Sequence, residues 1–257
     1  MKKRRVVGTL QMARAVFRRL VRERGLSRKR VEVAVKPLTP EEAIGRTRRK
    51  DYPIIKGKER VIEALVLGSK GQAFTDAPGG FSGTLGGVLR LPLDTSRRRA
   101  VFVAVLNAAC RALGLASGTV HCKDGDPERC GSRIAGVILA RRGACRVGLV
   151  GFNPALAAHL VRALGRRRVR ILDLNASNIG EVKSGVRVED GARAAEEVVR
   201  WADVVLVTGT TLVNGTFDVL LRLVHEHGKD YLPYGITIAG VSVLLGLPRE
   251  CPCGRND

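Results

Sequence analysis

The chain of 257 residues is long enough for one large domain or two ordinary ones, and its 45% of hydrophobic residues exclude a fully disordered protein. The formal net charge of +21 lies mostly in residues 1–60, which hold 20 Lys and Arg against 6 Asp and Glu. No apolar run reaches the roughly 18 residues that cross a bilayer, and the start MKKRR is not followed by the apolar segment of a signal peptide, so we expect a cytoplasmic protein.

The first half of the chain mixes strand and helix patterns. Apolar side chains at three- and four-residue spacing predict an amphipathic helix over residues 9–24. Alternating residues predict strands at 31–38 and in a hairpin that joins 60–68 to 71–78. The glycine-rich segment 79–87 is expected to be a loop.

Residues 97–114 carry the longest helical pattern of this half and are apolar on nearly all sides, which predicts a helix buried between layers. A short strand at 119–122 and a helix that begins near Asp126 are expected to follow. At the other end of the chain, Cys251 and Cys253 are separated by one residue, which is a weak metal signal, and we expect them in a frayed tail.

From residue 145 onward, strand and helix patterns alternate, which is typical of a parallel sheet with helices on both faces. Strands are predicted at 145–152, 169–174 and 203–211, with a last strand within the region 231–239, and helices at 153–165, 192–202 and 214–228. The predicted fold class is therefore α/β, with a smaller α+β domain in residues 1–140 and a Rossmann-like domain in residues 141–257.

A Rossmann-like domain binds its ligands outside the carboxyl ends of its strands. The residues expected to bind a ligand there are Gly151, Asn153, Asp173, Thr208, Gly209 and Asn214. The first loop reads GFNP and lacks the GxGxxG pattern, which disfavours ordinary dinucleotide binding. Asp173 lies at the end of the second strand, where an acidic residue can accept hydrogen bonds from ribose hydroxyls, so an adenosine-like ligand is one possibility. The alternative is an aspartate that only caps a helix or forms a turn.

The segment HCKDGDPERC concentrates imidazole, thiol and carboxylate groups, which favour a transition metal over magnesium. The metal ligands expected from it are His121, Cys122, Asp124 and Cys130. The two cysteines lie eight residues apart with no second CxxC pair, so further ligands would have to come from elsewhere. A capped helix start with incidental thiols is the alternative.

Five blocks in order give the chain a wider resemblance: YPIIKGKERVIEA (52–64), GSKGQAFTDAPGGFSGTL (68–85), TVHCKDGDPERC (119–130), GLVGFNPAL (148–156) and TGTTLVNGT (208–216). Together they resemble the "putative heavy-metal chelation" family. The resemblance implies an enolase N-terminal-like domain followed by a Rossmann-like domain, with the active site in the cleft between them. It also implies that the first domain lines this cleft with Lys56, Gln72, Thr75 and Asp76, of which Lys56 and Asp76, with Asp124, are the catalytic candidates.

The leading hypothesis is a protein that binds a transition metal, or a small metal-chelating ligand, in the interdomain cleft. The alternative is an enzyme that acts on a small polar or nucleotide-like substrate at the strand ends. Nucleic-acid binding through the basic N-terminus is not favoured, because only three Tyr and one Trp are present to stack on bases. The sequence predicts no membrane partner and leaves homo-oligomerisation open.

Overall fold

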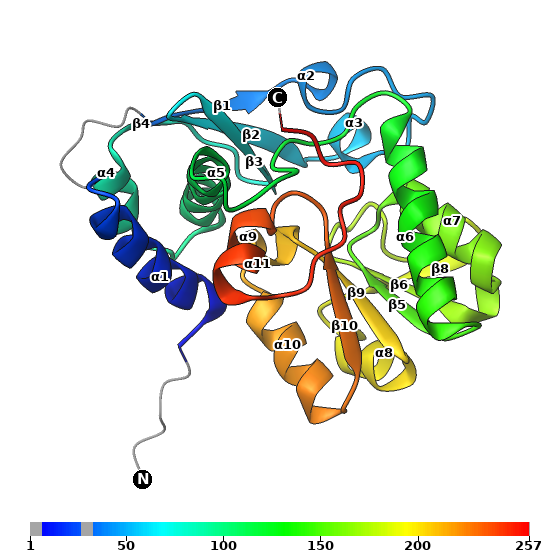
Figure 1. Ribbon diagram of the computed structural model, residues 1–257. Helices are drawn as coiled ribbons and strands as arrows, with labels where there is room; N and C mark the ends of the chain where they lie inside the picture. Colours follow the sequence, from blue (N-terminus) through cyan, green and yellow to red (C-terminus); the bar gives the residue numbers. More distant parts are fainter. Residues whose placement is uncertain (1–6, 27–32, 257) are drawn as a thin grey trace, which may run out of the picture.

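The computed structural model describes residues 7–26 and 33–256 and confirms the α/β fold class (Figure 1). The first half contains an antiparallel sheet in the order β3-β2-β1-β4, and the second half a six-stranded sheet in the order β10-β9-β5-β6-β8-β7. The elements of the first half are α1 (Thr9–Glu23), β1 (Val33–Leu38), α2 (Pro40–Ile44), α3 (Pro53–Lys56), β2 (Arg60–Val66), β3 (Ser69–Thr75), β4 (Phe81–Gly83), α4 (Leu85–Arg90) and α5 (Ser96–Ala112).

The second half begins with a long helix and then alternates strands and helices. Its elements are α6 (Asp126–Arg142), β5 (Val147–Val150), α7 (Pro154–Leu164), a 3-10 helix (Arg166–Arg168), β6 (Val169–Asp173), β7 (Val182–Lys183), β8 (Val186–Asp190), α8 (Ala195–Trp201), β9 (Val204–Thr208), α9 (Thr210–Asn214), α10 (Phe217–Glu226), β10 (Asp230–Tyr234) and α11 (Ala239–Leu245). The predicted domain division at residue 140 falls in the last turn of α6 and stays a prediction.

The second sheet is parallel except for its edge strand β7, which pairs with β8 in the antiparallel sense. Its central strands β5 and β9 are short and almost wholly buried, as expected where helices cover both faces. On one face Leu149 and Ile171 pack against α6 and α7, and on the other Val205 and Val207 pack into the core that includes α8 and α10. From β5 the chain continues on one side of this strand to β6 and β8. It then crosses to the other side of β5, where β9 and β10 lie, so the sheet has a topological switch point between β5 and β9.

Helix α5 is buried between the two halves, as its apolar pattern predicted. Every residue from Ala100 to Cys110 is buried, and the helix packs on β2 and β3 on one side and on α9 and α11 on the other. Asn107 lies in its middle and is fully buried. Its amide nitrogen donates to the main-chain oxygens of Gln72 (2.8 Å) and Thr237 (3.1 Å), and its oxygen accepts from the amide of Gly240 (2.7 Å). This one side chain therefore ties the first sheet to the loop that follows β10.

The prediction of a loop at residues 79–87 was wrong in part. Residues Phe81–Gly83 form β4, which pairs antiparallel with β1, and α4 begins two residues later. The Thr84 hydroxyl caps α4 by accepting a hydrogen bond from the amide of Gly87 (3.1 Å). Glycine lowered the local strand and helix propensity, but pairing with β1 and this cap outweigh it.

Several boundaries in the second half also differ from the sequence prediction. The strand predicted at 203–211 ends earlier, at Thr208, and the short helix α9 follows it. The last strand expected within 231–239 is β10, and the short helix α11 follows it. The hairpin of β7 and β8 was not predicted at all, because its strands are only two and five residues long. The strand predicted at 119–122 is reduced to a single bridge between Val120 and Arg255.

The chain end is docked rather than frayed, so that prediction was wrong. The tail runs from α11 up to the first sheet (Figure 1). Its residue Arg255 exchanges two main-chain hydrogen bonds with Val120 (2.8 and 3.0 Å), and Glu250 donates its amide to the main-chain oxygen of Pro233 (2.9 Å). The tail is thus held both at the end of β10 and beside the segment that carries His121.

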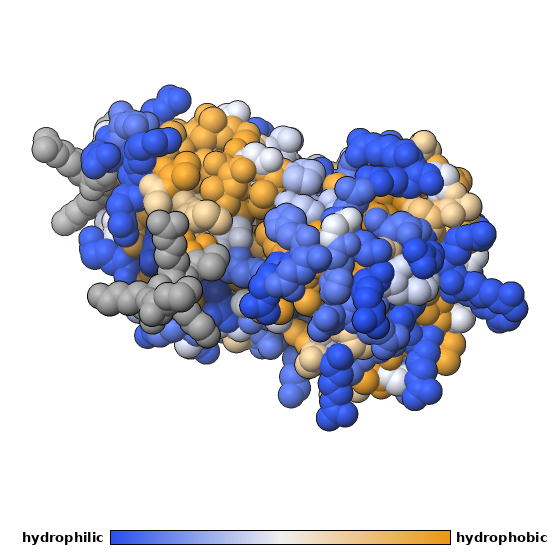
Figure 2. Space-filling model, turned by 90° about the horizontal axis from the view of Figure 1, so that it is seen from below, coloured by the Kyte–Doolittle hydropathy of each residue, from blue (hydrophilic) through white to orange (hydrophobic). Residues whose placement is uncertain are grey.

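Positive charge is not confined to the N-terminal segment. Figure 2 shows that hydrophilic residues cover most of the right half of the face seen from below, whereas apolar residues gather at its upper left. The exposed triplet Arg166–Arg168 belongs to the second half of the chain. Among the helices of the described residues, none has the length and apolar character needed to cross a bilayer.

Candidate functional site

A cavity of about 1230 Å³ lies between the first sheet and the carboxyl ends of the parallel strands. It opens at the switch point between β5 and β9, where a doubly wound sheet binds its ligands. Its volume is that of a pocket for a small organic molecule, far more than a single ion needs. Of the predicted ligand-binding residues, it is lined by Gly151, Asn153, Asp173, Thr208, Gly209 and Asn214.

Glycines allow the loops at the switch point to approach closely. Gly151 has a φ of 85°, and a Cβ atom there would lie 2.5 Å from Cγ2 of Thr208. A Cβ atom on Gly209 would lie 2.7 Å from the amide nitrogen of Ile238. The hydroxyl of Tyr234 donates to the main-chain oxygen of Gly151 (2.9 Å) and fixes the first loop. The two loops therefore form one rigid wall of the cavity.

The carboxylate of Asp173 organises the adjacent loops. It accepts hydrogen bonds from the amide of Phe152 (3.2 Å), the amide of Asn175 (2.9 Å) and the side chain of Asn178 (2.9 Å). Three donors already occupy this carboxylate, which supports the turn-forming alternative for it.

The amide side chains of Asn153 and Asn214 are likewise engaged within their own loops. Asn153 caps α7 by accepting from the amide of Leu156 (3.0 Å). Asn214 accepts from the amide (3.0 Å) and hydroxyl (2.8 Å) of Thr216. Both side-chain oxygens therefore already accept hydrogen bonds within their loops, so these two residues shape the cavity wall.

His121 lines the cavity, and within the described part of the chain only one of its ring nitrogens, Nδ1, has a hydrogen-bond partner. Its Nδ1 lies 2.6 Å from the main-chain oxygen of Cys122, and because a carbonyl oxygen only accepts, Nδ1 carries the proton. Its Nε2 is then the atom with an available lone pair, which is the arrangement of a metal-binding histidine. Burial lowers the pKa of His121 to about 4, although the hydrogen bond to Cys122 acts in the opposite direction. The imidazole is therefore neutral near pH 7.

Three cysteines line the same cavity: Cys122, Cys130 and Cys251. The pKa of the Cys130 thiol is raised to about 12, first by its hydrogen bond with Cys122 and also by burial, while its interaction with Cys251 acts in the opposite direction. The pKa of Cys251 is raised well above its ordinary value by its hydrogen bond with Cys130 and by burial. Cys251 was assigned to a frayed tail, and only the docking of that tail reveals its place here.

Three predicted site residues lie outside the cavity lining. The buried side chain of Gln72 donates to Oε2 of Glu63 (2.8 Å) and accepts from the amide of His121 (2.8 Å), so it positions the histidine. Thr75 is buried, and its hydroxyl accepts from the amide of Ala77 (3.0 Å).

Asp124 is the third of these. Its carboxylate accepts from the amide of Arg46 (2.8 Å), and its own amide donates to the main-chain oxygen of Ile44 (2.9 Å). The carboxylate thus holds the loop after α2 and is not part of the cavity lining.

The predicted metal ligands are brought together only in part. His121, Cys122 and Cys130 share the cavity, and Asp124 does not. Within residues 7–26 and 33–256, no three His, Cys, Asp or Glu side chains are arranged to hold a metal ion. The donors that line the cavity fit a transition metal by type, but they do not form a closed cage.

The catalytic candidates Lys56 and Asp76 are both exposed at the cavity, beside a carboxylate that the sequence did not single out. Burial, together with the nearby carboxylates of Asp173 and Asp76, raises the pKa of Glu59 to about 7. The signal available in the sequence was the block YPIIKGKER, in which Glu59 follows Lys56 by three residues. It did not reveal that Glu59 would face the second domain.

Tyr52 opens the same block and was also missed. Its side chain is buried (6% exposed) and lines the cavity. Its hydroxyl has no hydrogen-bond partner in the part of the chain that the structure describes. A buried hydroxyl without a partner costs about 1–3 kcal/mol, so a partner supplied by a ligand would offset that cost.

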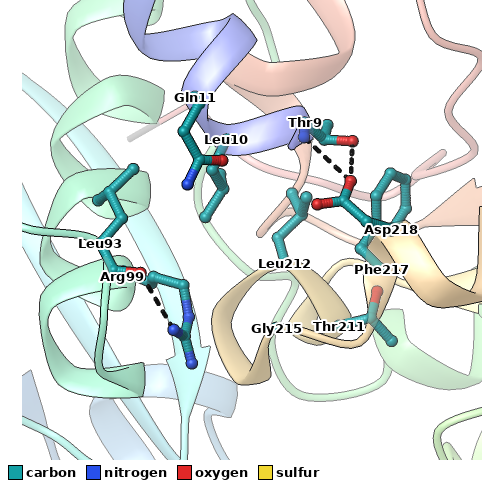
Figure 3. Close-up of a pocket in the computed structure, with 10 residues that line it drawn as sticks. All are labelled: Thr9, Leu10, Gln11, Leu93, Arg99, Thr211, Leu212, Gly215, Phe217 and Asp218. Carbon is teal, nitrogen blue, oxygen red and sulfur yellow. Dashed lines mark hydrogen bonds between the residues drawn. The ribbon is translucent and has the colours of Figure 1, made fainter. Parts of the chain in front are cut away.

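A second cavity of about 160 Å³ lies where the start of α1 meets α9 and α10 (Figure 3). Asp218 accepts hydrogen bonds from the amide (3.0 Å) and hydroxyl of Thr9 and so caps α1. The guanidinium of Arg99 donates to the main-chain oxygens of Val213 (2.6 Å) and Leu93 (3.2 Å). The side chains of Asp218 and Arg99 are thus engaged with the protein itself, and Asp218 anchors the start of α1.

Comparisons with known proteins find a family model and similar solved structures. Residues 135–243 match the model of the DUF364 family, described as "Putative heavy-metal chelation". The crystal structure of a protein with unknown function from Pyrococcus horikoshii, of this family, is 12% identical, with 88% of this chain and 79% of that chain covered and a TM-score of 0.49. One from Desulfitobacterium hafniense, also of unknown function, is 14% identical, with 72% and 71% covered and a TM-score of 0.49. No curated protein matches the chain. Over residues 135–243, the chain is therefore similar to the family described as "Putative heavy-metal chelation".

Proposed function

We propose that the protein binds a transition or heavy metal in the cavity between its two halves, as a complex with a small metal-chelating ligand. One observation carries this proposal: His121, Cys122 and Cys130 line a cavity of about 1230 Å³ at the switch point of the parallel sheet. Imidazole and thiolate are the ligands of choice for soft and borderline transition metals. The family description points in the same direction.

The cavity favours a metal complex over a bare ion. A structural metal site normally supplies four protein ligands, and the described residues contain no group of even three. Coordination positions that the protein leaves open would be filled by the chelating ligand. The size of the cavity allows for such a ligand.

The protein's own residues would perform distinct tasks. Nε2 of His121 would coordinate the metal. The imidazole would be held in place by the hydrogen bond from Nδ1 to the main-chain oxygen of Cys122, and the main chain of His121 by the hydrogen bond from its amide to Gln72. The loops at Gly151 and Thr208 would shape the wall against the organic part of the ligand. Apolar side chains such as Phe152 would exclude water from it.

A second candidate function is an enzyme that acts on a small polar or nucleotide-like substrate in the same cavity. The pKa of Glu59 near 7 favours it, because a carboxyl poised near neutral pH can take up and release protons. Lys56 and Asp76 line the cavity with it. Nucleic-acid binding, which the sequence did not favour, concerns a segment that includes residues 1–6 and 27–32, and these lie outside the described residues.

Cobalt(II) tests the leading proposal, because its absorption spectrum reports the ligands it binds. The full chain, without an affinity tag, is titrated with cobalt(II) alone and with cobalt(II) citrate, and the melting temperature is measured in parallel. We expect a rise in melting temperature and a changed cobalt spectrum, with affinity reduced by about 10-fold or more in His121→Ala. The matched control is His225→Ala, an exposed histidine on α10 outside the cavity.

Equal cobalt affinity in His121→Ala and the wild type would contradict the proposal. Stabilisation by nucleotides or amino-acid-like acids, lost in Glu59→Gln and unaffected by His121→Ala, would favour the enzyme instead.

A further inference from the structure

An exposed cluster of arginines lies at the end of the second half that is remote from the cavity. Arg162 is in the last turn of α7, and Arg166–Arg168 form the 3-10 helix that leads into β6. All four residues are exposed. Val169 begins β6 and pairs with Val147, the first residue of β5, so the cluster lies at the amino ends of the parallel strands. The cavity opens at their carboxyl ends.

The cluster keeps its positive charge, unlike a cation beside it. Arg146, which precedes β5, is paired with Asp203 (2.7 Å). In the part of the chain that the structure describes, none of the four clustered arginines forms a salt bridge. Arg168 donates to the main-chain oxygen of Leu164 (3.3 Å), a contact that holds the side chain without neutralising it. Like charges this close repel one another, so an anionic partner would relieve the repulsion.

We propose that this arginine cluster, Arg162 with Arg166–Arg168, binds the phosphate backbone of a nucleic-acid duplex. The inference goes beyond the proposed metal binding and does not depend on it, because the two surfaces lie at opposite ends of the sheet. A guanidinium presents a planar fork of N–H donors that matches two phosphate oxygens, and it is always charged in proteins. Four such groups within seven residues suit a partner whose phosphates repeat at short intervals.

The aromatic residues of the chain favour a duplex over a single strand. Proteins bind single strands by stacking the bases on aromatic rings. Tyr52 and Tyr234 are buried. The ring centroid of Trp201, at the end of α8, already lies 5.9 Å from the guanidinium carbon of Arg146 and 5.6 Å from that of Arg170. A duplex keeps its bases stacked inside and presents two phosphate backbones, so it requires cations and no aromatic platform.

The same end of the molecule lacks the apolar side chains that a membrane-binding surface needs. Peripheral binding to anionic lipids combines cations with apolar groups that enter the bilayer. Among the described residues, no exposed large hydrophobic side chain belongs to the loops that precede β5, β6, β9 and β10, at 143–146, 165–168, 202–203 and 227–229. In agreement, hydrophilic residues cover most of the right half of the face seen from below in Figure 2. The cluster therefore fits a soluble polyanion better than a lipid surface.

The experiment measures fluorescence anisotropy of short labelled duplexes, one of DNA and one of RNA, with the full chain at a series of salt concentrations. The wild type should bind at least one duplex, and the logarithm of its affinity should fall against the logarithm of the salt concentration with a slope of about −3 to −4. Arg166→Gln with Arg167→Gln should lower the affinity by about 10-fold and make the slope shallower by about 2. The matched control is Arg22→Gln with Arg24→Gln, which removes the same charge from exposed positions at the end of α1 and should leave the slope unchanged.

Both pairs of substitutions are at exposed positions, so the melting temperatures should match that of the wild type, and lost binding then reports lost contacts. No duplex binding at low salt, or binding that Arg166→Gln with Arg167→Gln leaves unchanged, would overturn the inference. It would also be overturned if single strands, poly-glutamate or anionic vesicles bound as tightly as the duplexes, or if only the α1 pair weakened binding. Cobalt(II) binding should be the same in the Arg166 and Arg167 double variant as in the wild type, which separates this surface from the cavity.

Discussion

Replacing Glu59 by Gln tests whether the wall between the two halves contains a buried, proton-binding carboxyl. Burial, together with the charges of Asp173 and Asp76, raises the pKa of Glu59 from 4.5 to about 7 in the folded protein. In the unfolded chain the pKa returns to its ordinary value. Between these two values the folded state binds more protons than the unfolded state.

The sign and size of the effect follow from this difference. A carboxyl whose pKa is raised on folding destabilises the protein as pH rises, so the Glu59 contribution is most favourable below about pH 4.5 and is lost by about pH 7. The full shift corresponds to about 3 kcal/mol, and the partial exposure of the side chain reduces our expectation to about 2 kcal/mol. Gln is uncharged at every pH and removes this dependence.

The free energy of unfolding is measured by urea titration at steps from about pH 4.5 to 8. The difference between Glu59→Gln and the wild type should grow in favour of Gln by about 2 kcal/mol across this range. Using the difference cancels the titration of all other groups. A flat difference for Glu59→Gln would refute the reasoning.

Three further predictions concern the packing that positions the site, each measured by urea unfolding. Asn107→Leu should cost about 3–5 kcal/mol, because it leaves buried main-chain groups of both halves without partners; a loss below about 1 kcal/mol would contradict that role. Gly71→Ala should cost about 2–4 kcal/mol, since its Cβ atom would lie 2.1 Å from the amide nitrogen of Ala108, whereas Gly136→Ala, with open space around it, should be neutral or stabilising. Tyr52→Phe should leave stability unchanged or raise it by up to about 1 kcal/mol, because no hydrogen bond is lost within the described structure; a clear loss would show that the hydroxyl has a partner.

The parallel sheet could be predicted from the sequence because its signal is local. Buried strands such as Val147–Val150 read as short apolar runs, and helix patterns follow them at regular intervals. The loops that line the cavity were then predicted by a general rule, since ligands bind at the carboxyl ends of such strands. Six of the eight predicted ligand-binding residues line the cavity, and the two exceptions, Gln72 and Thr75, are buried beneath it.

Features that depend on long-range pairing could not be predicted. The strand β4 exists because Phe81 pairs with Val35, and nothing in its glycine-rich sequence indicates that. Cys251 reaches the cavity only because the tail pairs with Val120, at a separation of more than a hundred residues. Asp124 illustrates the opposite error: its residue type suits a metal, but the loop after α2 uses its carboxylate.

The central claim is that the cavity between the two halves binds a metal, and metal analysis of the natural protein tests it most directly. The chain is purified without an affinity tag and without chelators, and its metal content is measured by mass spectrometry beside that of the variant with both His121→Ala and Cys122→Ala. We predict close to one transition or heavy metal per wild-type chain and a loss of most of it in the double variant. A wild-type protein that carries only trace metal, or a double variant that retains as much as the wild type, would contradict the account.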